Sequence, residues 1–123
     1  FLSVRIAPDK VRNVLDPDAV IKSIQIAAGL GATSSHTWLK LPVVDGMHRV
    51  LDSTTLPSLL LGGDPVGDPE ATYAEWAHAL THPVAVGLVI GRALLYPTDD
   101  DVAKAVDVAA ALVHQRPIHK GVA

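Results

Sequence analysis

The chain has 123 residues, of which 49% are hydrophobic and 19% charged, and its formal net charge is −3. This length suits one domain with its own core and is too short for two. The composition is that of a globular chain and excludes a disordered one. The slightly negative charge offers no basic surface to nucleic acid or to an anionic membrane. The absence of cysteine excludes disulfides, thiolate metal ligands and a thiol nucleophile.

The hydropathy pattern bears on location and partners. No apolar run is long enough to span a bilayer, and no signal-peptide pattern opens the chain. We therefore expect a cytoplasmic protein with no membrane or nucleic-acid partner. The sequence leaves open whether it forms a homo-oligomer.

The first half of the chain carries clear start and stop signals. Residues 1–15 read as the tail of a strand followed by a loop. Asp16-Pro17 is typical of a helix start, with an N-cap acceptor followed by proline in the first turn, and Gly29 ends that helix. The further elements expected in this half are a strand over 36–42, a short helix over 46–51 and a buried strand over 56–61.

The second half of the chain carries the same kind of start and stop signals. Asp68-Pro69 opens a helix that runs to Leu80. The later elements expected are an apolar strand over 84–90, a single helical turn over 93–96, an amphipathic helix from after Thr98 to Val113 and a loose tail over 115–123.

Strands that alternate with helices predict a parallel sheet with right-handed crossover connections. We therefore expect a single α/β domain over residues 1–123. Three strands leave two unpaired edges, which proteins usually cover. The sheet is expected to belong to a larger closed sheet, completed by missing chain, by another copy or not at all.

Lys40 is the one charged residue in the strand over 36–42. Alternation places Trp38 and Lys40 on one side and Leu39 and Leu41 on the other. We expect Lys40 to project inward near the carboxyl end of the strand, where α/β folds place their chemistry. A desolvated amine near other cations can attack a carbonyl carbon. A lysine that simply reaches solvent at a strand end fits the spacing equally well.

Glycines follow two of the predicted strands. Gly62-Gly63 comes directly after the strand over 56–61, and Gly91-Arg92 comes directly after the strand over 84–90. Glycine lets backbone N–H groups approach an oxyanion, and arginine adds a charge-assisted contact. Either pair alone is explained by a tight turn. Together they predict a phosphate site.

Other polar residues are weaker candidates. Asp64 borders the glycine pair and could contact a substrate, although a turn residue there is simpler. His48 could reach a substrate or be a solvated helix residue. His78 and His82 lie four residues apart, but we interpret them as surface residues and expect no metal site.

The segments Leu39–Pro42, Leu59–Gly63 and Gly87–Leu94 resemble strands six, seven and eight of the class I, Schiff-base aldolases of the DhnA/LacD/DeoC-like superfamily. The chain as a whole is similar to the aldolase-like proteins of bacterial myo-inositol catabolism. This resemblance implies the fold class, the C-terminal part of a TIM (β/α)8 barrel comprising strands six to eight with their helices. It also places residues 1–15 in the loop after strand five.

The resemblance further implies a carbon–carbon lyase. Lys40 would form the Schiff base with a phosphorylated keto sugar or sugar acid, and Gly62, Gly63, Gly91 and Arg92 would hold its phosphate. The substrate of the inositol branch is 6-phospho-5-dehydro-2-deoxygluconate, which gives dihydroxyacetone phosphate and malonate semialdehyde. No metal or organic cofactor is implied, and the acid/base partner is expected upstream of Phe1.

One departure concerns the deoxyribose-phosphate aldolases, which carry a second lysine where this chain has Leu59-Leu60-Leu61. Two other functions remain open at this point. One is a non-catalytic phosphate-binding fragment. The other is a phosphate-binding barrel isomerase in which Lys40 serves only as a charge.

Overall fold

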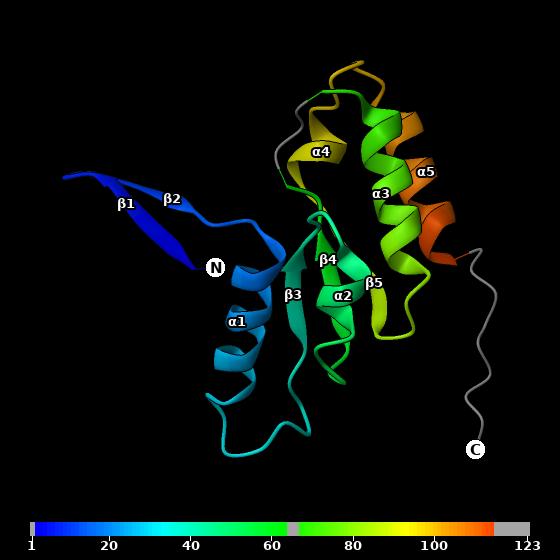
Figure 1. Ribbon diagram of the computed structural model, residues 1–123. Helices are drawn as coiled ribbons and strands as arrows, with labels where there is room; N and C mark the ends of the chain where they lie inside the picture. The colour runs from blue at the N-terminus through cyan, green and yellow to red at the C-terminus, as the bar shows by residue number, and fades with distance from the viewer. Residues whose placement is uncertain (1, 64–66, 115–123) are drawn as a thin grey trace, which may run out of the picture.

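The residues that the structure describes form two separate β-sheets. The computed structural model describes residues 2–63 and 67–114. Strands β1 (Ser3–Ala7) and β2 (Lys10–Asn13) pair antiparallel. Strands β3 (Leu39–Pro42), β4 (Ser58–Leu61) and β5 (Ala85–Val89) form a parallel sheet in the order β3-β4-β5 (Figure 1). The three predicted parallel strands are therefore confirmed.

Helices connect and cover the parallel sheet. Asp16 Oδ1 accepts a hydrogen bond from the Ala19 amide at 2.8 Å, and Asp68 Oδ1 accepts one from the Glu70 amide at 3.1 Å. These bonds satisfy amides that have no partner within the helix, which confirms both predicted helix starts. The helices are α1 (Pro17–Ala28), α2 (Met47–Leu51), α3 (Pro69–Leu80), α4 (Arg92–Leu95) and α5 (Val102–His114).

The start of the chain differs from its prediction. The expected strand tail and loop over 1–15 is instead the hairpin β1–β2, whose register pairs Ser3 with Asn13. Their side chains also meet, with Ser3 Oγ donating to Asn13 Oδ1 at 2.8 Å. Apolar and polar residues alternate here on strands that are exposed throughout most of their length. The predicted tail over 115–123 lies outside the described residues.

The predicted TIM-barrel fold class is wrong. Among the described residues, β3 and β5 each pair only with β4, and the hairpin forms a sheet of its own. The chain is a small α/β domain with a short antiparallel sheet and a three-stranded parallel sheet. Alternating strands and helices predict parallel pairing, but they carry no signal for closure, because closure depends on which strands meet at the two edges.

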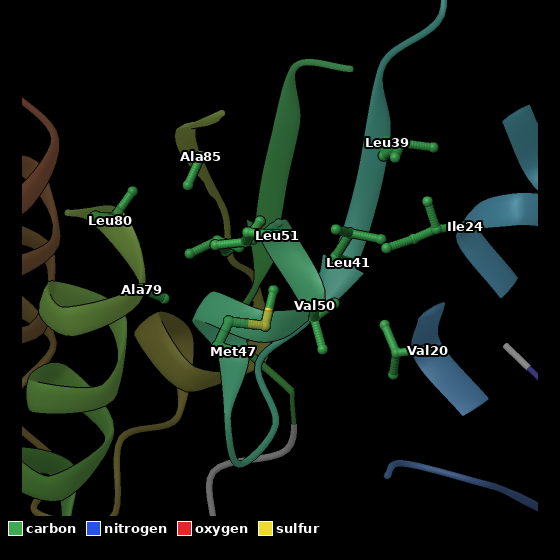
Figure 2. Packing of buried hydrophobic residues seen from close by; sticks show 11 residues of the cluster. Val20, Ile24, Leu39, Leu41, Met47, Val50, Leu51, Ala79, Leu80 and Ala85 are labelled. Atoms are coloured by element: carbon green, nitrogen blue, oxygen red, sulfur yellow. The ribbon is translucent and has the colours of Figure 1, made fainter. Parts of the chain in front are cut away.

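The main core lies on one face of the parallel sheet. Figure 2 shows α2 over the centre of this face, with α1 on one side and the end of α3 on the other. The buried residues of this cluster are Val20, Ile24, Leu39, Leu41, Met47, Val50, Leu51, Leu60, Ala79, Leu80 and Ala85. A second cluster joins α3, α4 and α5 around Trp76, which is 1% exposed.

Within residues 2–63 and 67–114, no helix combines the length and apolar character needed to cross a membrane.

Candidate functional site

A pocket of about 530 Å³ lies at the carboxyl ends of β3, β4 and β5. Parallel strands end at the same edge of a sheet, so loops that are far apart in sequence meet there. Asn13 at the end of the hairpin and residues of α3 also line it. Its lining residues are Asn13, Leu15, Lys40, Pro42, Val43, Leu61, Gly62, Gly63, Thr72, Glu75, Trp76, Val89, Gly91 and Arg92.

Five residues predicted from sequence line this one pocket: Lys40, Gly62, Gly63, Gly91 and Arg92. They come from three consecutive strands and the loops that follow them. The sheet therefore brings together two cationic side chains and two glycine-containing turns.

Lys40 does not have the buried environment expected for it. Its side chain is exposed, as is the neighbouring Trp38, which is 61% exposed. Leu39 and Leu41 point into the core, so the alternation along β3 is as predicted. Among the described residues, no element packs over the other face, and the Lys40 ammonium remains in contact with water.

The surroundings of the glycines at positions 62, 63 and 91 differ. A Cβ at Gly62 would lie 2.5 Å from Ile90 Cγ2, so close packing requires glycine there. Gly63 has a φ of +67°, which L-residues rarely adopt. A Cβ at Gly91 would meet nothing within 4 Å. The space beside Gly91 is therefore open toward the pocket that it lines.

Sequence reasoning missed part of the lining. Thr72, Glu75 and Trp76 lie three and four residues apart on α3, which places them on one helix face. That spacing was a usable signal, although it does not say which face meets the pocket. Asn13 reaches the pocket from the end of β2, and nothing in the sequence indicates this contact.

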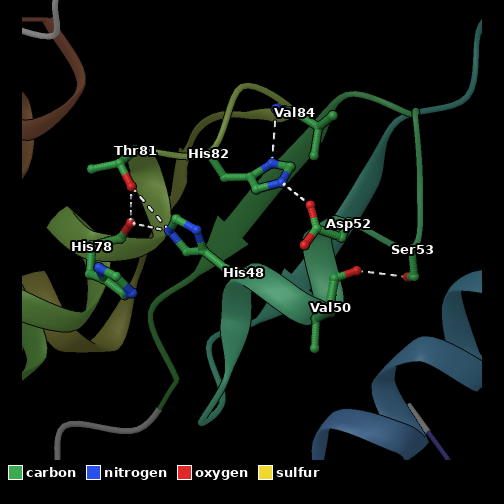
Figure 3. Close-up of polar contacts among 8 residues, drawn as sticks. All are labelled: His48, Val50, Asp52, Ser53, His78, Thr81, His82 and Val84. Atoms are coloured by element: carbon green, nitrogen blue, oxygen red, sulfur yellow. Dashed lines mark hydrogen bonds and ion pairs between the residues drawn. The ribbon is translucent and has the colours of Figure 1, made fainter.

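Asp64 lies outside the described residues, and His48 is remote from the pocket. His48 Nε2 is 3.0 Å from the His78 carbonyl oxygen and 3.1 Å from Thr81 Oγ1 (Figure 3). Its ring stacks on that of His78 with centroids 4.5 Å apart. His48 therefore joins α2 to the end of α3 and does not face the candidate site.

His82 belongs to the same junction. Its Nε2 is 3.0 Å from Asp52 Oδ1, and the Val84 amide donates to its Nδ1 at 3.3 Å. The His82 side chain is only 11% exposed, so its prediction as a surface residue is wrong, whereas His78 is exposed as predicted. Within the described part of the chain, no three His, Asp or Glu side chains are grouped to hold a metal ion.

Comparison with known proteins identifies a family and a similar solved structure. The model of the Cgl0159-like family matches residues 1–110. The crystal structure of Cgl0159 from Corynebacterium glutamicum is similar with a TM-score of 0.82 and 61% sequence identity, over 89% of this chain and 36% of that chain. This chain therefore spans little more than a third of the length of that protein. No curated protein matches it.

The identification with class I aldolases is wrong. The matching family is the Cgl0159-like one, and no aldolase family matches. The assignments that depended on that resemblance, namely lyase activity, Schiff-base chemistry and inositol catabolism, lose their support with it. Apolar strands that end in glycine occur at the carboxyl edge of many parallel sheets, so these segments reflected sheet geometry that unrelated functions share.

Proposed function

This chain belongs to the Cgl0159-like family, and we propose that its pocket at the carboxyl ends of β3, β4 and β5 binds the phosphate group of a phosphorylated small molecule. One observation carries the proposal: Lys40, Arg92 and the glycine turns at 62–63 and 91 line the same pocket. The pocket volume of about 530 Å³ is in the range of small-molecule sites.

The charges favour a phosphate over a neutral ligand. A guanidinium contacts phosphate oxygens in a planar, bidentate geometry, and an ammonium adds a compact point charge. Both cationic side chains line the pocket together with Gly91, where a Cβ would have no neighbouring atom within 4 Å. A phosphate can therefore approach the backbone there while it contacts Arg92 and Lys40.

The rest of the lining indicates what the phosphate is attached to. The Glu75 carboxylate would repel a second anionic group, and it accepts hydrogen bonds from hydroxyls. Thr72 and Asn13 add further hydrogen-bonding groups to this pocket. A phosphate on a short hydroxylated carbon skeleton, such as a sugar phosphate, satisfies both ends of the pocket.

The proposed role is binding, and Lys40 acts in it as a charge. An exposed Lys40 is compatible with this role, which does not require a desolvated amine. The cytoplasmic location and the phosphorylated small-molecule partner expected from the sequence stay predictions.

Calorimetric titration with glucose 6-phosphate, glucose and inorganic phosphate tests the proposal. We expect heat from the two phosphates and none from glucose, with Lys40→Gln and Arg92→Gln each weakening binding by about tenfold, as for loss of one charge-assisted hydrogen bond. Lys22→Gln on the exposed surface of α1 is the matched control, because it removes one positive charge outside the pocket. Equal binding of glucose and its phosphate, or equal effects of all three substitutions, contradicts the proposal.

A further inference from the structure

The parallel sheet has one covered and one open face. Leu39, Leu41 and Leu60 lie in the core beneath the helices. The opposite face, which we call the open sheet surface, consists of Trp38, Lys40, Leu59, Leu61 and Val89.

The open sheet surface is apolar apart from Lys40. Trp38 is 61% exposed, and Val89 is 40% exposed. Parallel sheets occur almost only where both faces are covered, because their strands are apolar on both sides. This face therefore has the composition of a buried layer and the exposure of a surface.

The edges of the sheet are open as well. Among the described residues, β3 and β5 pair only with β4, so each has one side without a neighbouring strand. A groove of about 220 Å³ runs between α1 and β3, lined by residues that include Ile24, Ala27, Trp38 and Leu39. An unpaired edge offers backbone N–H and C=O groups to an added strand.

The comparison with Cgl0159 indicates the occupant. That chain is 61% identical over the matched part, yet the match covers only 36% of it. We infer that the open sheet surface is the docking surface for the rest of a Cgl0159-like polypeptide, the part that has no counterpart in these 123 residues. This part adds a strand beside β3 and packs apolar side chains against Trp38 and Val89. The open sheet surface shares Lys40, Leu61 and Val89 with the lining of the pocket, but the inference does not depend on what the pocket binds.

A second copy of this chain is a poorer occupant. A two-fold dimer through this surface brings the same patch of both copies together. It would place two Lys40 ammonium groups in one desolvated interface, where like charges oppose association.

The chain has no cysteine, so single thiols can report on this surface. Val89→Cys lies on the open sheet surface, because Val89 is the partner of Leu61 in the register of β4 and β5. Ile26→Cys is the matched control, because Ile26 is 50% exposed on α1, two residues from the buried Ile24 and hence on the opposite helix face. Each variant is labelled with a maleimide in the chain alone and in a chimera, in which this chain replaces the matching part of the C. glutamicum protein. Mass mapping of the labelled peptide gives the rate.

We expect the residue 89 thiol to react at least about tenfold more slowly in the chimera, as expected for a site that reacts only on local opening. The residue 26 thiol should react equally fast in both. Equal rates for the residue 89 thiol in the two proteins overturn the inference. Sedimentation of the chain alone is a second check that needs no chimera. A dimer with a protected residue 89 thiol would make the surface a contact between copies and would also overturn the inference. Co-expression of the chain with the rest of the C. glutamicum protein as a separate polypeptide should give a complex, and failure to co-purify also counts against the inference.

Discussion

At the carboxyl edge of the sheet, some residues are required by packing and others are left available for binding. Gly62 packs against Ile90, so its lack of a side chain serves the fold. Gly91 lines the same pocket, but a Cβ there would meet no atom within 4 Å, so packing does not account for this glycine. The two glycines look alike in the sequence, and only their surroundings distinguish them.

Substitution of each glycine by alanine should therefore affect a different property, stability at Gly62 and phosphate binding at Gly91. Gly62→Ala should lower the free energy of unfolding by about 1–3 kcal/mol, because its Cβ overlaps Ile90. Gly91→Ala should change stability by less than about 1 kcal/mol and weaken phosphate binding by about tenfold, because its methyl occupies the space of the anion. Denaturant unfolding and calorimetric titration measure the two effects. A Gly91→Ala variant that binds phosphate normally would show that the anion does not approach the backbone there.

Tyr73 gives a prediction for alkaline pH. The Tyr73 hydroxyl is buried and has no hydrogen-bond partner among the described residues. Burial raises the pKa of Tyr73 above the usual 10.0, and the negative charge of Asp99 raises it further. As pH rises above 10.0, the unfolded chain releases this proton first, so the contribution of Tyr73 to stability is complete below that pH and is lost as pH rises through the folded pKa.

Tyr73→Phe should remove this part of the alkaline decline. At neutral pH the substitution should leave stability unchanged or raise it by up to about 1 kcal/mol, because no hydrogen bond is lost. The control is Tyr96→Phe, since Tyr96 is 70% exposed. Unfolding free energies of the three proteins at about pH 8 and about pH 11 give the comparison. An alkaline decline that is the same in the wild type and in Tyr73→Phe would refute the assignment.

At the scale of elements, the helix starts of α1 and α3 are each stabilised by a hydrogen bond between residues that are close in sequence. Asp16→Ala should destabilise the protein by about 1 kcal/mol, because the Ala19 amide loses its acceptor. Asp18→Ala is the control. Asp18 pairs with Arg49, but the two side chains are 80% and 63% exposed, so this loss should cost less than about 0.5 kcal/mol. Thermal unfolding distinguishes them, and equal losses would mean that the cap is not what stabilises α1.

Comparison of the predicted and observed elements shows which structural features can be predicted from the sequence. Aspartate followed by proline marks helix starts through backbone geometry alone, so α1 and α3 begin where predicted. The exposure of Lys40 depends on whether another layer covers its face, which no local pattern encodes. The contact of His48 with the end of α3 likewise joins residues 30 or more positions apart. Short-range chemistry was therefore predictable, and long-range packing was not.

At the scale of the molecule, the same contrast applies to the pocket. The direction of parallel strands was enough to bring Lys40, Gly62 and Arg92 to one edge, so their convergence followed from the predicted topology. Barrel closure required pairing at the sheet edges, and the residues that pair at β1–β2 instead form a separate sheet. The convergence of these residues at the pocket therefore does not depend on barrel closure. The wrong prediction of a barrel leaves the prediction of their convergence unaffected.

The hairpin β1–β2 should therefore be separable from the core. Both core clusters contain only residues that follow it, and its strands are largely exposed. Figure 1 shows the hairpin projecting away from the parallel sheet. Removing residues 1–12 should change the free energy of unfolding by less than about 0.5 kcal/mol, whereas Leu60→Ala in the buried strand should cost about 2–5 kcal/mol. Asn13 is retained in this truncation, so phosphate binding should weaken little. Denaturant unfolding monitored by tryptophan fluorescence gives both values, and a truncation as damaging as Leu60→Ala would mean that the hairpin and the sheet fold as one cooperative unit.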